Sequence, residues 1–160
     1  MSKQNVIKLI IWILCFQLIG FFLGIMTQAN IPSWYNGLHK STLTPPGWVF
    51  SLVWSLLYAL LAIVGFMLWQ NRSKPQIKTI LNLYLVQLIM NWAWTPLFFH
   101  LHWIGFSFLW ILLMIGLNAL IILKVKNIER VVGLLLTPYF LWLIFASYLN
   151  GVIWFLNSQV

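Results

Sequence analysis

Five long runs of apolar residues, separated by shorter polar stretches, dominate the pattern of this chain. They cover about residues 6–26, 47–69, 79–99, 103–125 and 131–156. Each run is long enough to cross a bilayer as a helix, which takes about 20 residues. The runs are continuously apolar, whereas the strands of a membrane barrel would alternate between apolar and polar positions. The pattern therefore predicts one all-α membrane domain, a bundle of five transmembrane helices.

The composition agrees with a membrane protein and removes several classes of function. Of the 160 residues, 62% are hydrophobic and only 6% are charged, against about 25% charged residues in an average soluble domain. Glu129 is the single acidic residue, so a mechanism that needs two carboxylates cannot operate within one chain. The cores of the apolar runs contain no Asp, Glu, Lys or Arg, and ion-coupled transporters usually need such a residue.

The net charge of +8 comes from basic residues that are scattered between the apolar runs. They form no dense patch for nucleic acid, so membrane topology explains them better. With five spans, eight of them fall on one side of the membrane and Lys40 alone falls on the other. The eight are Lys3, Lys8, Arg72, Lys74, Lys78, Lys124, Lys126 and Arg130. Because basic loops stay inside, we expect a cytoplasmic N-terminus in the cell membrane, with the first loop and the C-terminus outside.

The loop between the first two spans, about residues 27–46, is unusually aromatic for a connection. It contains Trp34, Tyr35 and the pair Pro45–Pro46, and Trp48 follows directly. Long loops without regular structure are usually functional or disordered, and this one is too aromatic for a disordered segment. We therefore expect an ordered lid over the external end of the bundle.

Three spans carry polar and aromatic side chains at the 3–4 spacing that puts them on one helix face. These residues are Phe50, Trp54 and Tyr58 in the second span, Gln87, Asn91, Trp94, Thr95 and Phe98 in the third, and Tyr139, Trp142, Ala146, Asn150 and Trp154 in the fifth. Three such faces could enclose a pocket for a large, flat, hydrophobic ligand. Helix packing and interfacial aromatic belts produce the same spacing, so spacing alone leaves both interpretations open.

Histidines and small residues offer two further possibilities. His39, His100 and His102 could bind a metal or ligate haem iron, but the spacing of the last two does not fit one helix face, and we predict no metal site. Gly20 and Gly24 form a GxxxG pattern that lets another helix come close. That helix could belong to the same bundle or to a second copy of the chain.

Several of these residues stand in motifs of a known family. The first loop reads Trp-Tyr-Asn-Gly-Leu-His-Lys at 34–40 and Thr-Pro-Pro-Gly-Trp-Val-Phe at 44–50. The third span ends in Trp-Thr-Pro-Leu-Phe-Phe at 94–99, and the fifth contains Pro-Tyr-Phe-Leu-Trp at 138–142 and Phe-Ala-Ser-Tyr-Leu-Asn at 145–150. In this order the motifs resemble those of the translocator protein family, also called tryptophan-rich sensory proteins or peripheral benzodiazepine receptors.

The resemblance implies a five-helix bundle whose first loop caps a pocket for porphyrins, such as protoporphyrin IX and haem, and for benzodiazepine-site drugs. It also implies that the chain can form a homodimer. The pocket residues that it implies are Tyr35, Pro45, Trp54, Asn91, Trp94, Trp142, Ala146 and Asn150. The loop and the three faces add Trp34, Trp48, Phe50 and Gln87 to the candidate ligand-binding residues.

The chain departs from the family pattern at a few positions. Ser41 stands where the family usually has Pro, and Leu43 stands where the loop often has Trp. No Lys or Arg follows Tyr148, although the sterol-recognition pattern needs one. Since that pattern is weak in any case, we predict no sterol specificity from it.

We therefore predict an integral membrane protein that binds a tetrapyrrole and acts in porphyrin sensing, trafficking or buffering. The porphyrin is its ligand, and no further cofactor is required. The resemblance also suggests light-dependent oxidative degradation of the bound porphyrin, for which Trp54 and Trp142 would act as catalytic electron donors. Facilitated porphyrin transport and a regulatory role without a ligand are the remaining alternatives.

Overall fold

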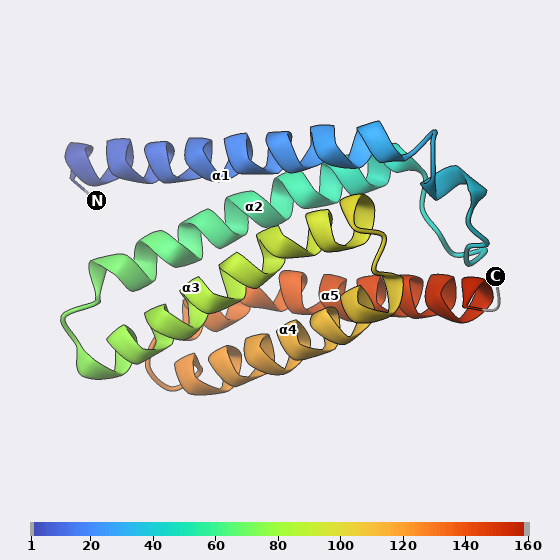
Figure 1. The fold of residues 1–160 in the computed structure, drawn as a ribbon. Coiled ribbons are helices and arrows are strands. Elements are labelled where there is room, and N and C mark those ends of the chain that lie inside the picture. Colours follow the sequence, from blue (N-terminus) through green and yellow to red (C-terminus); the bar gives the residue numbers. More distant parts are fainter. Residues whose placement is uncertain (1, 159–160) are drawn as a thin grey trace.

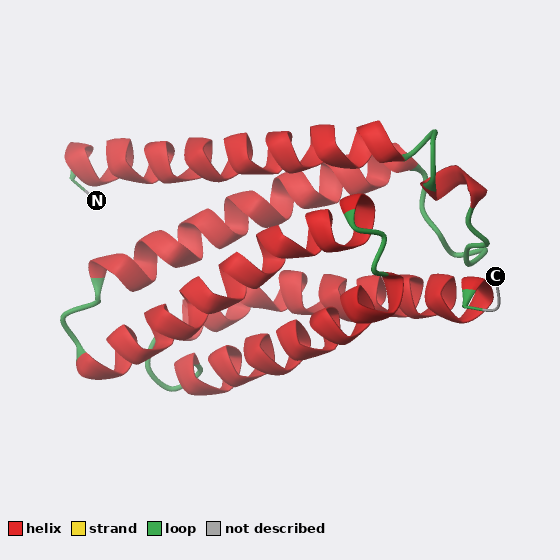
Figure 2. Cartoon of the chain, viewed as in Figure 1, coloured by secondary structure: helices red, strands yellow, loops and turns green. Residues whose placement is uncertain are grey.

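The computed structural model describes residues 2–158, and in that part of the chain it contains five long helices and no strand (Figure 1 and Figure 2). The helices are α1 (Lys3–Asn30), α2 (Gly47–Gln70), α3 (Pro75–Thr95), α4 (Ile104–Val125) and α5 (Arg130–Asn157). A short 3-10 helix, η1 (Tyr35–Gly37), lies in the first loop, and a π-helical turn, η2 (Pro96–His100), follows α3. The predicted all-α fold with five helices is confirmed.

Four helices, α1, α2, α4 and α5, are long and apolar enough to cross a membrane. The third, α3, has 21 residues, which is also the length of a span, but it carries more polar side chains. Two of these, Gln87 and Asn91, are buried inside the bundle. These two amides of α3 are thus turned away from lipid, and the chain is a multi-pass membrane protein.

The helices pack mainly as neighbours in the chain. Figure 1 shows α1 lying along α2, with α3 beside α2 and α4 and α5 forming the other side of the bundle; the most extensive contact joins α4 to α5. The first helix contributes least to the core, since Phe16 is its only buried residue. Most of α1 therefore remains available to lipid or to another protein.

The ends of the bundle differ in charge. The N-terminus, the α2–α3 connection and the α4–α5 connection lie at one end, while the long first loop and the end of α5 lie at the other (Figure 1). The basic residues therefore gather at the first end, as predicted, and Lys40 lies at the opposite end. An ion pair between Lys74 and Glu129, 3.5 Å from Nζ to Oε1, joins the two connections of the basic end.

Several helix boundaries differ from those predicted, among them both ends of α1 and of α3; α3 ends at Thr95 and not at residue 99, because η2 follows it. The first helix continues past residue 26 to Asn30, and polar side chains in its last turn satisfy their donors on carbonyls of the preceding turn. Thr27 Oγ1 donates to the Leu23 carbonyl at 3.0 Å, and Asn30 Nδ2 donates to the Met26 carbonyl at 2.9 Å. The third helix starts earlier than residue 79, at Pro75, in the first turn where a missing N–H costs little.

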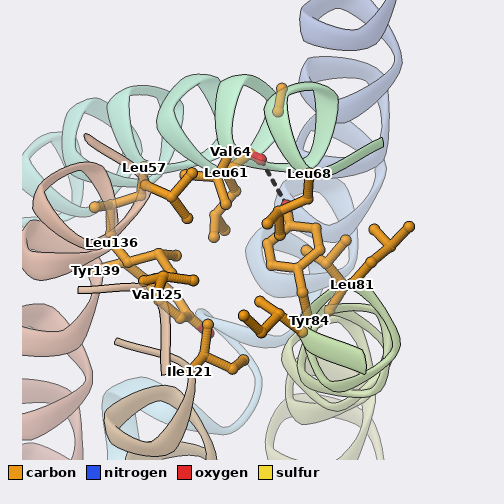
Figure 3. Packing of buried hydrophobic residues seen from close by; sticks show 14 of the residues in the cluster. Leu57, Leu61, Val64, Leu68, Leu81, Tyr84, Ile121, Val125, Leu136 and Tyr139 are labelled. Atoms are coloured by element: carbon orange, nitrogen blue, oxygen red, sulfur yellow. Dashed lines mark hydrogen bonds between the residues drawn. The ribbon is translucent and has the colours of Figure 1, made fainter. Parts of the chain in front are cut away.

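Close helix packing in the core depends on a glycine. The hydroxyl of Tyr84 on α3 donates to the carbonyl of Leu61 on α2 (Figure 3). A Cβ on Gly65, one turn further along α2, would lie 2.7 Å from the Trp12 ring and 3.1 Å from the Tyr84 ring. The missing side chain thus lets α1 and α3 approach α2 at the same level.

The two glycines of the GxxxG pattern have different surroundings. A Cβ on Gly20 would lie 2.6 Å from the Tyr58 ring, so Gly20 packs within the bundle. A Cβ on Gly24 would meet nothing within 4 Å. Close packing inside the bundle therefore explains Gly20 and not Gly24.

Candidate functional site

A buried polar network joins three helices at the middle of the bundle. The hydroxyl of Tyr58 on α2 donates to Asn91 Oδ1 on α3 at 3.2 Å, and Asn91 Nδ2 donates to the hydroxyl of Tyr139 on α5 at 3.0 Å. Gln87 Nε2 donates to the same Tyr139 oxygen. All four side chains are buried, and their bonds satisfy polar groups that would otherwise be costly in hydrocarbon.

An aromatic cluster adjoins this network on the side of α2 and α5. The ring of Trp54 lies 5.5 Å from that of Tyr58 and 6.4 Å, edge to face, from that of Trp142. The ring of Phe50 also lies edge to face with that of Trp142, with 5.8 Å between the ring centres. Ala146, one turn beyond Trp142, packs against the same core. The predicted faces of the second, third and fifth spans therefore do meet.

A second group of aromatic residues joins the first loop to the end of α3. The ring of Trp34 stacks on His102 at 4.0 Å and meets Phe98 edge to face at 5.4 Å. Trp94 stacks on Phe98 at 5.0 Å, and Tyr35 lies 6.3 Å from the same ring. The loop residues Trp34 and Tyr35 are thus connected to the bundle through Phe98, which the candidate set did not include.

Burial changes the chemistry of the loop tyrosine. The Tyr35 side chain is partly covered by Phe98 and Phe99, and this burial raises the pKa of its hydroxyl above the ordinary value. Desolvation penalises a phenolate more than a neutral phenol. Tyr35 therefore remains an uncharged hydrogen-bonding group at physiological pH.

The first loop is an ordered lid, held by its own polar groups. Lys40 Nζ donates to the carbonyls of Tyr35 at 2.8 Å, Leu38 at 3.0 Å and Asn36 at 3.3 Å. The ammonium group of Lys40 also lies 4.8 Å from the centre of the Tyr35 ring. Lys40, the basic residue at this end of the bundle, therefore stabilises the folded conformation of the loop.

Two contacts fasten the loop to α5. The backbone N–H of His39 donates to Asn157 Oδ1 at 3.0 Å, and Asn157 Nδ2 donates back to the His39 carbonyl at 2.9 Å. Nearby, Ser41 Oγ and the Tyr148 hydroxyl lie 2.9 Å apart. We call these contacts, formed by His39, Ser41, Tyr148 and Asn157, the loop clasp. His39 and Tyr148 stood in the family motifs and Ser41 was a departure from them, but none of the four residues belonged to the candidate ligand-binding set. The 3–4 spacing of side chains along the spans gave no sign of these contacts.

Four buried polar atoms of candidate residues lack a hydrogen-bond partner within residues 2–158. They are the indole Nε1 atoms of Trp94 and Trp142, Gln87 Oε1 and Asn150 Oδ1. Asn150 uses its Nδ2 to bond the Ile104 carbonyl at 2.9 Å, which ties α5 to α4. A ligand with an apolar body and a few polar atoms could pair with such groups.

Two candidate residues lie at the margin of this arrangement. Trp48, in the first turn of α2, is 68% exposed and faces outward from the bundle. Pro45 is half-buried at the end of the loop, two residues before α2 begins at Gly47. The structure thus gathers most of the candidate residues around the two aromatic groups, whereas Trp48 lies outside them.

Comparisons with known proteins agree with this architecture. Residues 12–155 match the TspO/MBR family. The tryptophan-rich protein TspO of Archaeoglobus fulgidus is 35% identical over 97% of this chain and 100% of its own length. The translocator proteins of Sus scrofa and Homo sapiens are 31% and 34% identical, over 87% and 76% of this chain and 86% and 73% of their own lengths. The chain therefore belongs to the TspO/MBR family.

Proposed function

We propose that this protein binds a tetrapyrrole such as protoporphyrin IX or haem, and that it senses, carries or buffers that molecule in the membrane. One observation carries the proposal: Trp54 and Trp142 meet edge to face beside the buried network of Tyr58, Asn91 and Tyr139. This combination offers aromatic surfaces and neutral polar groups without a charge at membrane depth.

The chemistry of the proposed ligand matches that combination. A porphyrin is a flat, largely apolar ring, and aromatic side chains favour stacked or edge contacts with such rings. The free indole N–H groups of Trp94 and Trp142 and the free Oδ1 of Asn150 could pair with its polar atoms. The ligand needs no further cofactor from the protein. Similar chains carry the name translocator protein, which supports trafficking among the proposed roles.

The proposed orientation places the N-terminus in the cytoplasm. Eight of the nine basic residues lie toward the end of the bundle that contains the N-terminus, and basic segments are retained on the cytoplasmic side of a cell membrane. The loop clasp and the end of α5 would then face outward. Adding reporter groups to the first loop and to the α2–α3 connection, and testing which one a membrane-impermeant reagent reaches, would examine this orientation.

A homodimer is part of the proposal, and α1 is the helix that suits it. Only Phe16 of α1 is buried within the chain, and the side of Gly24 is open. Small residues let two membrane helices approach closely. Cross-linking through Gly24→Cys, compared with a cysteine on the outer face of α4, would test whether α1 forms the contact.

A second function is favoured by the contact of Trp54 with Trp142 at 6.4 Å. Under light, an excited porphyrin could accept an electron from one indole and pass it to dioxygen, which becomes superoxide, while the two indoles share the radical cation that remains. Return of an electron from the porphyrin to the indole radical, and addition of the superoxide to the porphyrin cation, would then restore the indole and leave the ring oxidised by one dioxygen. Facilitated porphyrin movement without chemistry is the other alternative, and flux through sealed vesicles would distinguish it from binding alone.

The binding proposal can be tested with protoporphyrin IX and purified protein in nanodiscs. Titration should change the porphyrin absorbance at micromolar concentrations, and Trp142→Ala should weaken binding at least tenfold. Trp69→Ala is a matched control because Trp69 is 45% exposed at the other end of α2 and contacts Trp12. If the wild type does not bind, or if both variants lose affinity equally, the proposed site is wrong.

A further inference from the structure

A groove runs between α2 and α5 on the outer surface of the bundle. Its volume is about 400 Å³, and its lining is apolar or aromatic: Val53, Leu56, Leu57 and Leu60 from α2, and Pro138, Leu141, Trp142 and Phe145 from α5. Leu56 and Leu141 are each 59% exposed at its margins. Since α2 and α5 are both long and apolar enough to cross a membrane, the groove opens toward the hydrocarbon of the bilayer.

Trp142 belongs both to this groove and to the aromatic cluster of the candidate site. It lines the groove, while its ring meets Phe50 at 5.8 Å and Trp54 at 6.4 Å. The indole of Trp142 therefore lies between the groove and the aromatic cluster. Rotation of the Trp142 side chain would connect the groove to the cluster.

The helix that carries Trp142 is weakened close to it. Pro138 lies one turn before Trp142 inside α5 and also lines the groove. Because Pro138 has no N–H, the carbonyl of Leu134 loses its partner in the helix, and helices bend more readily at such points. In addition, α5 packs far less extensively on α2 than on α4. Of these two neighbours, α5 is therefore held less firmly to α2 than to α4.

The route from the aqueous side is closed in a different way. The loop clasp fastens the lid to α5 through the paired bonds between His39 and Asn157 and through the Ser41–Tyr148 contact. Three bonds from Lys40 stiffen the lid itself. A ligand arriving from water would have to break several hydrogen bonds, whereas a ligand in the bilayer meets only apolar side chains.

We propose that the groove between α2 and α5 is the passage by which a flat, apolar ligand moves between the bilayer and the aromatic cluster, with Trp142 as its gate. This inference rests on the proposed function, which supplies the ligand class. An apolar macrocycle concentrates in hydrocarbon, so the bilayer is its larger source. Leu56 and Leu141 form the outer rim of the passage and lie outside the proposed binding site.

The first experiment narrows the rim and measures protoporphyrin IX binding by stopped-flow absorbance in nanodiscs. Leu56→Trp and Leu141→Trp should each slow association and dissociation at least fivefold and by the same factor, because a ligand crosses a passage in both directions. The dissociation constant should stay within twofold of wild type. Leu113→Trp is the matched control, since Leu113 is 63% exposed on α4, outside the groove.

Two results of this experiment would overturn the passage. Unchanged rates in both rim variants would show that the ligand does not pass there. A weaker affinity with an unchanged association rate would make the rim a contact surface and not a passage. Failure of the wild type to bind protoporphyrin IX at all would instead reject the proposed function, so the two failures are distinguishable.

The second experiment tests the route through the first loop. The association rate of protoporphyrin IX is measured in proteoliposomes for the wild type and for Asn157→Ala, which loses both bonds to the His39 backbone and so opens the loop clasp. The rate should be the same in both proteins. An association rate that rises several-fold in Asn157→Ala would assign the passage to the loop.

Discussion

Asn91 Nδ2 donates a hydrogen bond to the Tyr139 hydroxyl at 3.0 Å and so connects α3 to α5. Gln87 donates to the same oxygen, and Tyr58 joins through Asn91. In a membrane interior, neither water nor lipid can replace such partners. Because Tyr58 also contacts Trp54 at 5.5 Å, the polar network holds the aromatic cluster at a fixed position between three helices.

Tyr139→Phe should destabilise the protein by removing the shared acceptor. The side-chain amides of Gln87 and Asn91 would remain buried but lose a hydrogen-bond partner. We expect this loss to lower the free energy of unfolding by about 1–3 kcal/mol. Thermal unfolding in nanodiscs measures the loss. Gln87→Leu combined with Tyr139→Phe should recover part of it because the free amide of Gln87 is then removed. A double variant whose stability equals the sum of two independent losses would contradict the shared acceptor.

Gly65→Ala should destabilise the bundle although alanine is the better helix former. Its Cβ would lie 2.7 Å from the Trp12 ring, and overpacking of this kind costs about 1–3 kcal/mol. Gly116→Ala is the control, because a Cβ there meets nothing within 4 Å and should gain up to about 1 kcal/mol of helix propensity. Unfolding temperatures that rise in both variants would show that α1 and α3 do not need the glycine.

The sequence predicts the helices well because hydrocarbon thickness and backbone desolvation permit few alternatives to continuous apolar helices. It predicts their ends less well, since these depend on single side chains. Thr27 and Asn30 are polar but still belong to α1, where each donates to a carbonyl four residues earlier. Those bonds depend on side-chain rotamers that a hydropathy pattern does not contain.

The sequence predicted which residues of the candidate site share a helix face, but it did not predict which side chains contact one another. The 3–4 spacing put Gln87 and Asn91 on one face of the third span, but it could not show that Tyr139 is their common partner. Trp48 was included because it adjoins the loop, yet it stands 68% exposed at the start of α2. The sequence could not show the role of Lys40 in closing the loop either, because its three carbonyl partners are brought together only by the fold of the loop.

Asn157→Ala should loosen the lid formed by the first loop without unfolding the bundle. The variant loses both bonds to the His39 backbone, each worth about 0.5–1.5 kcal/mol. The amide hydrogen of His39 should therefore exchange at least tenfold faster in hydrogen-exchange mass spectrometry. Asn71→Ala is the control, since Asn71 Nδ2 bonds only the Met67 carbonyl of its own helix at the other end. Equal loop exchange in the two variants would contradict the loop clasp.

High pH should release the loop through Tyr35. Burial raises the pKa of this hydroxyl, so its contribution to stability is complete below about pH 10, its unfolded value, and is lost as the pH rises through the folded pKa. Fluorescence of the neighbouring Trp34 should then change. Tyr35→Phe retains Lys40 and should shift or remove this transition, whereas an unchanged transition would assign it to another group.

Trp142→Phe should separate binding from photochemistry. Phenylalanine keeps an aromatic ring against Phe50 and Trp54 but is much harder to oxidise than an indole. If the indoles supply electrons to an excited porphyrin, the variant should bind protoporphyrin IX within about threefold of wild type and lose most of its light-dependent bleaching. Trp69→Phe, at the other end of α2, is the control and should bleach normally. Bleaching at the wild-type rate in a Trp54→Phe, Trp142→Phe double variant that still binds would exclude both residues as donors and leave binding as the function of the aromatic cluster.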